Sequence, residues 1–167
     1  MQDHEVSTLR MQRTDAAFNI YIELVTFMEQ VGPIQRGWQA FAAGIATTII
    51  DGLPAVCALI NSNGQAHTQA VLRGMIEASL DLVLLVENHD YADSLILATQ
   101  MGVKRKLSRE LETGLTITAH RNQVIANLDE AARQVDVLKK RGVKVPSIGE
   151  KFAKAPEHYR SLQPFYD

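Results

Sequence analysis

The sequence predicts an all-α protein, folded as an antiparallel bundle of five or six helices. Apolar residues recur at spacings of three and four through most of the chain, and strand-like alternation is almost absent. Glycine, proline and asparagine punctuate these periodic segments at short intervals. Because long helices joined by short turns pack antiparallel, we expect one helical-bundle domain over residues 1–167.

The first helix is expected within residues 1–35, from about Val6 to Gln30. Its apolar face consists of residues spaced by three and four, namely Phe18, Ile22, Val25 and Met28. Gly32 and Pro33 follow, and this pair is typical of a helix end.

A second helix is predicted from Arg36 to Ile50. Asp51 is expected to cap a continuation over residues 53–60, with Pro54 tolerated in its first turn. The turn that follows is indicated by the run Asn61-Ser62-Asn63-Gly64.

The stretch from Trp38 to Ile60 is long enough to span a bilayer, which needs about 20 residues. Its only charge, Asp51, lies near the centre, where a carboxylate costs roughly 2.5–3.5 kcal/mol. Gly52 and Pro54 also interrupt the stretch. We therefore expect a kinked, buried core helix and no contact with a membrane.

The third predicted helix, about Ala66 to Asn88, is the most apolar in the chain and is expected to lie at the centre of the bundle. Asp90 is expected to cap a fourth helix over residues 91–113, which Gly114 would end.

The fifth predicted helix runs from about Thr116 to Arg141 and ends before Gly142. It carries a narrow apolar seam suited to packing along one neighbouring helix, formed by Val124, Leu128, Ala131, Val135 and Leu138.

The remaining residues, 143–167, are predicted to form a short helical tail. Ser147 and Glu150 have the spacing of a capping box for a helix over residues 148–154. Pro156 permits a further turn or two, as far as Gln163.

The charge balance excludes a protein whose surface is positively charged overall. There are 17 basic and 19 acidic residues, which gives a net charge of −2, so nucleic-acid binding would need a local patch. A single cysteine, Cys57, excludes an internal disulfide. The polar N-terminal residues lack the apolar core of a signal peptide, and we therefore expect a cytoplasmic protein.

A charged stripe on the third helix is the main candidate for function. Gln69, Arg73, Glu77 and Asp81 are four residues apart and so share one helix face. On a central helix, Arg73 would need a carboxylate partner such as Glu77. Two interpretations stay open: an internal ion pair that sets helix register, or a cleft that binds an anion or a partner's charged group.

Motifs for catalysis are absent from the sequence. No two histidines have metal-ligand spacing on one predicted helix, and there is no nucleophile elbow, P-loop or dinucleotide fingerprint. We therefore predict no catalytic residue, no metal site and no cofactor. The basic cluster of residues 104–109 is followed by Glu110 and Glu112, which favours a solvated face of mixed charge.

Several motifs resemble an uncharacterised family of bacterial all-helical proteins that carry R-x-x-x-E on a central helix. The matching segments are Arg73-Gly74-Met75-Ile76-Glu77, Asp90-Tyr91-Ala92-Asp93, residues 147–153, and Tyr159-Arg160-Ser161-Leu162. The architecture of that family is similar to the HEPN superfamily, helical dimers that include ribonucleases of toxin and defence systems. Those enzymes use an R-x(4–6)-H motif, and no arginine of this chain precedes a histidine at that spacing.

We therefore predict a helical binding or interaction protein of bacterial or phage origin, forming a homo-oligomer, most simply a dimer. RNA and protein both stay open as partners. The alternative that the resemblance implies is a metal-independent, HEPN-like ribonuclease. The residues expected to form the binding surface are Gln69, Arg73, Glu77 and Asp81, with Tyr159 and Arg160 covering them.

Overall fold

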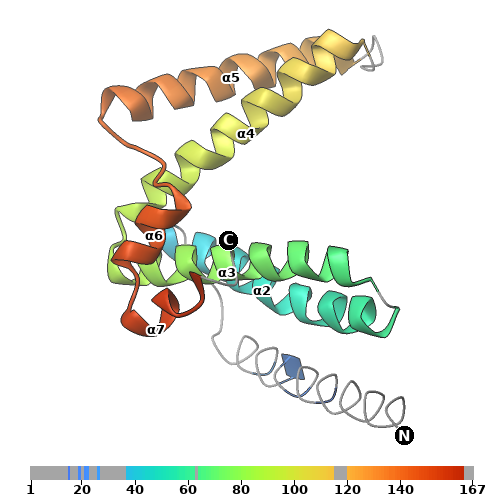
Figure 1. The fold of residues 1–167 in the computed structure, drawn as a ribbon. Helices are drawn as coiled ribbons and strands as arrows, with labels where there is room; N and C mark the ends of the chain where they lie inside the picture. Colours follow the sequence, from blue (N-terminus) through green and yellow to red (C-terminus); the bar gives the residue numbers. More distant parts are fainter. Residues whose placement is uncertain are drawn as a thin grey trace, which may run out of the picture. The chain divides into compact units, whose positions relative to one another are not determined.

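The fold is all-α in the residues that the structure, a computed structural model, describes: 15, 19, 21–22, 26, 37–62, 64–114 and 120–163. No strand occurs in these ranges, which confirms the predicted fold class (Figure 1). The six described helices are α2 (Trp38–Asn61), α3 (Gln65–Glu87), α4 (Tyr91–Thr113), α5 (Arg121–Lys140), α6 (Ile148–Lys154) and α7 (Glu157–Arg160).

Two compact units make up the described part of the chain. One contains α2 and α3 together with the C-terminal segment from Lys151 onward, and the other comprises residues 88–150, with α4 and α5. Within each unit the two long helices pack against each other as a pair. The expectation of one domain over residues 1–167 stays a prediction.

The helix expected within residues 1–35 lies mostly outside the described residues. The described positions in this range, among them Tyr21, Ile22 and Thr26, are helical. The Thr26 hydroxyl donates a hydrogen bond to the Ile22 carbonyl at 2.8 Å, as the hydroxyl of a helical threonine does.

α2 is one continuous helix, so the predicted break with a cap at Asp51 is wrong. Asp51 lies exposed within the helix, and Pro54 lies inside it. Pro54 removes one backbone amide donor from the helix. Ile50 and Val56, on either side of it, are both buried, and this packing keeps the helix continuous.

The expectation that α2 is a buried core helix is also wrong. Ile50 and Val56 are its only buried residues. Small or polar residues, such as Thr47, Thr48 and Asp51, are exposed along it, while the large apolar residues are partly covered. A pair of helices can bury only the facing side of each, and this geometry leaves the other side of α2 in contact with solvent.

α3 is central only in its C-terminal half. Leu80, Leu84 and Leu85 are buried there, whereas Leu72 is 42% exposed and Val86 56% exposed. The expectation that the whole helix lies at the centre of the bundle is therefore wrong for its first half. Apolar composition alone does not reveal how many neighbours a helix has.

α4 and α5 form a pair that the predicted seam holds together. Four of the five seam residues are buried, and Leu97 of α4 clusters with Val135 and Leu138 of α5. Arg141 at the end of α5 forms a 2.7 Å ion pair with Asp93 near the start of α4, so the two helices run antiparallel.

The ends of α4 match the prediction in position, but the N-terminal cap differs. The Asp90 side chain makes no capping hydrogen bond, and its backbone is helical. Asn88 Oδ1 instead accepts a hydrogen bond from the Asp90 amide at 3.1 Å. Gly114 ends α4 in the left-handed conformation, with φ of 65°, which glycine adopts without strain.

The C-terminal segment confirms the predicted capping box. Glu150 Oε2 accepts hydrogen bonds from the Ser147 amide (2.7 Å) and hydroxyl (2.9 Å). The Ser147 hydroxyl in turn accepts the Glu150 amide at 3.3 Å. The α6 helix that follows is anchored by Phe152, and the adjoining Ala155 is also buried.

Candidate functional site

The charged stripe of α3 passes from solvent into a partly buried environment along the helix. Gln69 and Arg73 are exposed, while Glu77 and Asp81 are partly buried. This gradient follows from the position of the α3 core, because the buried leucines begin only at Leu80. The four residues therefore share a face, but they do not share an environment.

Asp81 pairs with a residue that the sequence analysis did not single out. Lys151 Nζ lies 2.6 Å from Asp81 Oδ1, and the two side chains are only 12% and 18% exposed, respectively. The contact joins α6 to α3. Lys151 precedes the buried Phe152, and this adjacency was the only sequence signal that could have placed the lysine near a core helix.

Arg73 lies where water can reach it. Because Arg73 is exposed, its charge is not buried, and the expected pairing with Glu77 stays a prediction. Gln69, Leu72 and Gly74 are exposed around it, and a Cβ added at Gly74 would meet nothing within 4 Å. A guanidinium in such a setting can present a fork of N–H donors to a carboxylate or phosphate.

The two residues expected to cover the stripe are engaged at the C-terminal segment. Arg160 Nη2 donates a hydrogen bond to the Ala153 carbonyl at 3.2 Å. Tyr159 is partly buried, and its ring lies 4.6 Å from that of His158 at an angle of 45°. The Arg160 hydrogen bond ties α7 to the end of α6, whereas the ring contact lies within α7. A role for either residue in binding stays a prediction.

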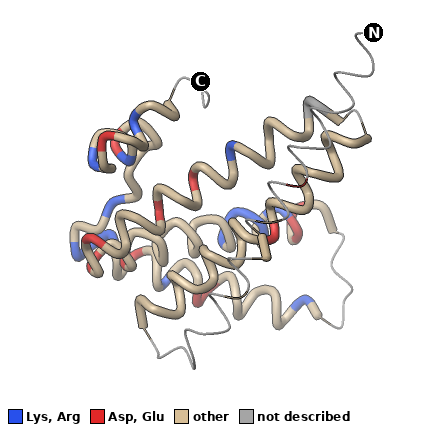
Figure 2. The backbone as a smooth tube through the Cα atoms, turned by 90° about the horizontal axis from the view of Figure 1, so that it is seen from below, with Lys and Arg blue, Asp and Glu red and all other residues tan. Residues whose placement is uncertain are grey.

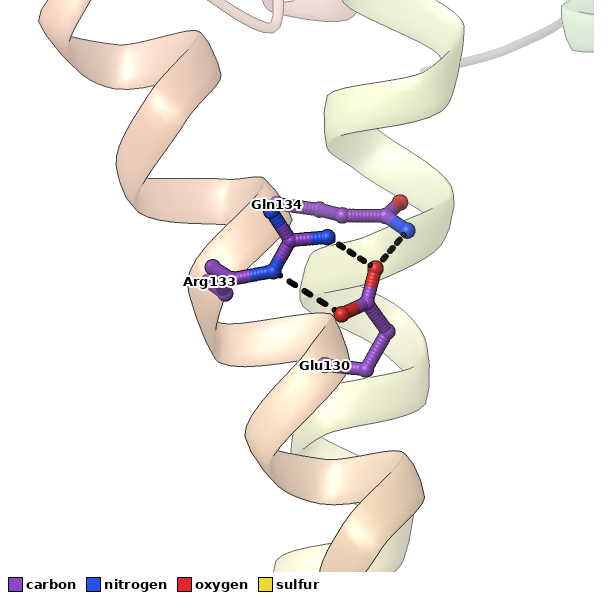
Figure 3. Close-up of polar contacts among 3 residues, drawn as sticks. All are labelled: Glu130, Arg133 and Gln134. Atoms are coloured by element: carbon purple, nitrogen blue, oxygen red, sulfur yellow. Dashed lines mark hydrogen bonds and ion pairs between the residues drawn. The ribbon is translucent and has the colours of Figure 1, made fainter.

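Residues of both charge signs occur on the described helices (Figure 2). On α5, Arg133 and Gln134 donate hydrogen bonds to the carboxylate of Glu130 at 2.6–2.9 Å (Figure 3). These bonds, chiefly those from Arg133, lower the pKa of Glu130 from 4.5 to about 2. The Glu130 carboxylate therefore stays ionised, and its negative charge is balanced by Arg133 of the same helix.

Two features bear on metal and membrane binding. In the described ranges, no group of three or more His, Cys, Asp or Glu side chains is arranged to hold a metal ion. Among the helices of those ranges, α2 is long and apolar enough to cross a membrane, judged by length and composition alone.

Comparison of the chain with protein-family models, with curated proteins and with solved structures finds no match.

Proposed function

We propose that this chain is a helical interaction protein that binds an anionic group of its partner through Arg73 and Gln69 on α3. The observation that carries the proposal is that Arg73 is exposed on α3, beside the exposed residues Gln69 and Leu72. Its neighbour Leu72 adds an exposed apolar contact on the same part of the helix.

The gradient along the stripe limits the proposed surface to its N-terminal half. Asp81 is held by Lys151, so a partner would have to break that ion pair in order to reach it. Gln69 and Arg73 are already exposed. A hydrogen bond to a charged group contributes about 1.5–3 kcal/mol, which is enough to orient a partner that also contacts Leu72.

Titration with nucleotides and short labelled RNAs tests the proposal, by calorimetry and by fluorescence anisotropy. We expect binding that Arg73→Ala weakens by about 1.5–3 kcal/mol. Arg121→Ala, which removes an exposed arginine at the start of α5, is the matched control and should leave the affinity unchanged.

Two results would count against this assignment. If neither nucleotides nor RNAs bind and Arg73→Ala only lowers stability, the stripe has a structural role. If the purified chain cleaves RNA in the presence of a chelator and Arg73→Ala abolishes the cleavage, the protein is an enzyme rather than a binding module.

A further inference from the structure

The C-terminal segment, described over residues 151–163, is a small element held by few contacts. It contains most of α6 and all of α7, helices of seven and four residues. Helices shorter than about 12–15 residues are not stable by themselves in water. Phe152 and Ala155 are the buried residues of the segment, and the Lys151–Asp81 ion pair joins it to α3. The segment is therefore folded because it is docked, and not by its own helix propensity.

The connection that precedes the segment allows it to leave α3 without unfolding a long helix. Val143 packs against the apolar cluster of α4 and α5, and the capping box begins at Ser147. Between these two points, Lys144 and Val145 are exposed and lie outside any helix. Movement of the segment can therefore be taken up over a few residues of extended chain.

The segment docks on the face of α3 that carries the charged stripe. Glu77, Asp81 and Leu84 are spaced by four and three residues, so they lie on one face. Arg73, toward the start of α3, is exposed, whereas Asp81 is partly buried and Leu84 is buried. Detachment of the segment removes the Lys151 ammonium from Asp81 and opens this half of the stripe to solvent.

We propose that the C-terminal segment is a detachable cover of α3, which opens as a unit while the α2–α3 and α4–α5 pairs stay folded. Elements with few buried side chains open at a lower free-energy cost than the core of the same protein. The surface that opens takes a short amphipathic helix of a partner, in which a basic side chain replaces Lys151 at Asp81 and an apolar side chain replaces Phe152.

The spacing along α3 specifies this partner helix further. Arg73 and Asp81 are eight residues apart, which is about 12 Å along the helix axis. A partner helix that contacts both carries an anion and a cation about two turns apart. The contact with Arg73 rests on the proposed function, whereas the opening of the cover does not.

Thiol labelling of the full chain tests the opening. Cys57 is replaced by alanine, and a single cysteine is placed at Ala155 or at Ala131 of α5, which are 1% and 2% exposed. We expect a maleimide to modify Ala155→Cys about tenfold or more faster than Ala131→Cys, because only the segment opens locally. Amide exchange of the unsubstituted chain gives the same comparison, and the amides of residues 151–163 should exchange faster than those of residues 124–138.

Removing the ion pair shows what keeps the cover closed. Asp81→Asn should speed the labelling of Ala155→Cys by about a further tenfold and leave Ala131→Cys unchanged. Asp93→Asn is the matched control, since it removes the ion-pair partner of Arg141 in the other unit, and it should not change the rate at Ala155→Cys. Equal rates at the two cysteines, or equal acceleration of both by Asp81→Asn, would overturn the proposal, because the chain would then open only as a whole.

A peptide tests the surface under the cover. A labelled peptide with the sequence of residues 148–163 supplies Lys151 and Phe152 from outside. It should bind the full-length Phe152→Ala variant about tenfold or more tightly than the wild type, whose own segment competes at high effective concentration. Lys151→Ala in the chain should act in the same direction, and Lys151→Glu in the peptide should remove most of the affinity. Absence of binding to both chain variants, with circular-dichroism spectra unchanged, would overturn the docking surface and leave anion binding by Arg73 to its own titration.

Discussion

Lys151 and Asp81 form a 2.6 Å ion pair with most of both side chains removed from water. In such an environment, removing one partner of an ion pair leaves the remaining charge poorly solvated. The pair therefore holds the C-terminal segment, with its buried Phe152, in the same compact unit as α3.

We expect Asp81→Asn to lower the free energy of unfolding by up to about 3 kcal/mol, because the Lys151 ammonium loses its counter-charge. Urea denaturation followed by circular dichroism measures this loss. Asp51→Asn, which changes an exposed aspartate of α2, should have little effect.

A double variant separates the pair from other roles of Asp81. Asp81→Asn combined with Lys151→Met removes both charges and should be more stable than Asp81→Asn alone. Equal stability of the two variants would mean that Lys151 does not depend on Asp81.

At the scale of the elements, the contact between α2 and α3 depends on a glycine. A Cβ added at Gly52 would lie 2.7 Å from both Cγ and Sδ of Met75 on α3. The glycine thus permits a close approach of the two helices. A Cβ added at Gly44, by contrast, would meet nothing within 4 Å.

These two glycines give opposite predictions. Gly44→Ala should raise the free energy of unfolding by about 1 kcal/mol, because alanine has the higher helix propensity and space is open. Gly52→Ala should not reach this gain, because Met75 must move, and Gly52→Val should be less stable than the wild type. Thermal denaturation of the three variants is the measurement, and equal gains from both alanines would contradict the close approach.

At the scale of the whole molecule, α2 poses the question of membrane contact. Its length and composition suit a bilayer, yet its exposed positions include Asp51, Pro54 and Asn61. The exposed hydroxyls of Thr47 and Thr48 donate hydrogen bonds to the Ala43 and Gly44 carbonyls of the same helix.

We expect the chain not to co-float with neutral phospholipid vesicles, because burying the Asp51 carboxylate in a bilayer would cost roughly 2.5–3.5 kcal/mol. Flotation on a density gradient is the measurement. Asp51→Leu removes this cost and should increase the fraction bound, whereas a wild-type chain that floats with the vesicles would show that α2 enters lipid.

Local sequence specified most of the secondary structure. The bounds of α4 and α6, the Ser147–Glu150 capping box, the stop at Gly114 and the seam of α5 were all predicted, because each depends on residues within about four positions of one another. The break expected at Asp51 was wrong for the complementary reason, since buried residues on both sides of Pro54 outweigh one missing hydrogen bond.

Burial, by contrast, was settled by packing between helices. The stripe of α3 was evident from the spacing of its residues, but which of them meet water depends on where α2 and the C-terminal segment cover the helix. Asp81 pairs with Lys151, which is distant in sequence, and Arg73 lies exposed. Periodicity reveals which residues share a face, whereas only the neighbours of that face decide whether a charge on it is paired, solvated or offered to a partner.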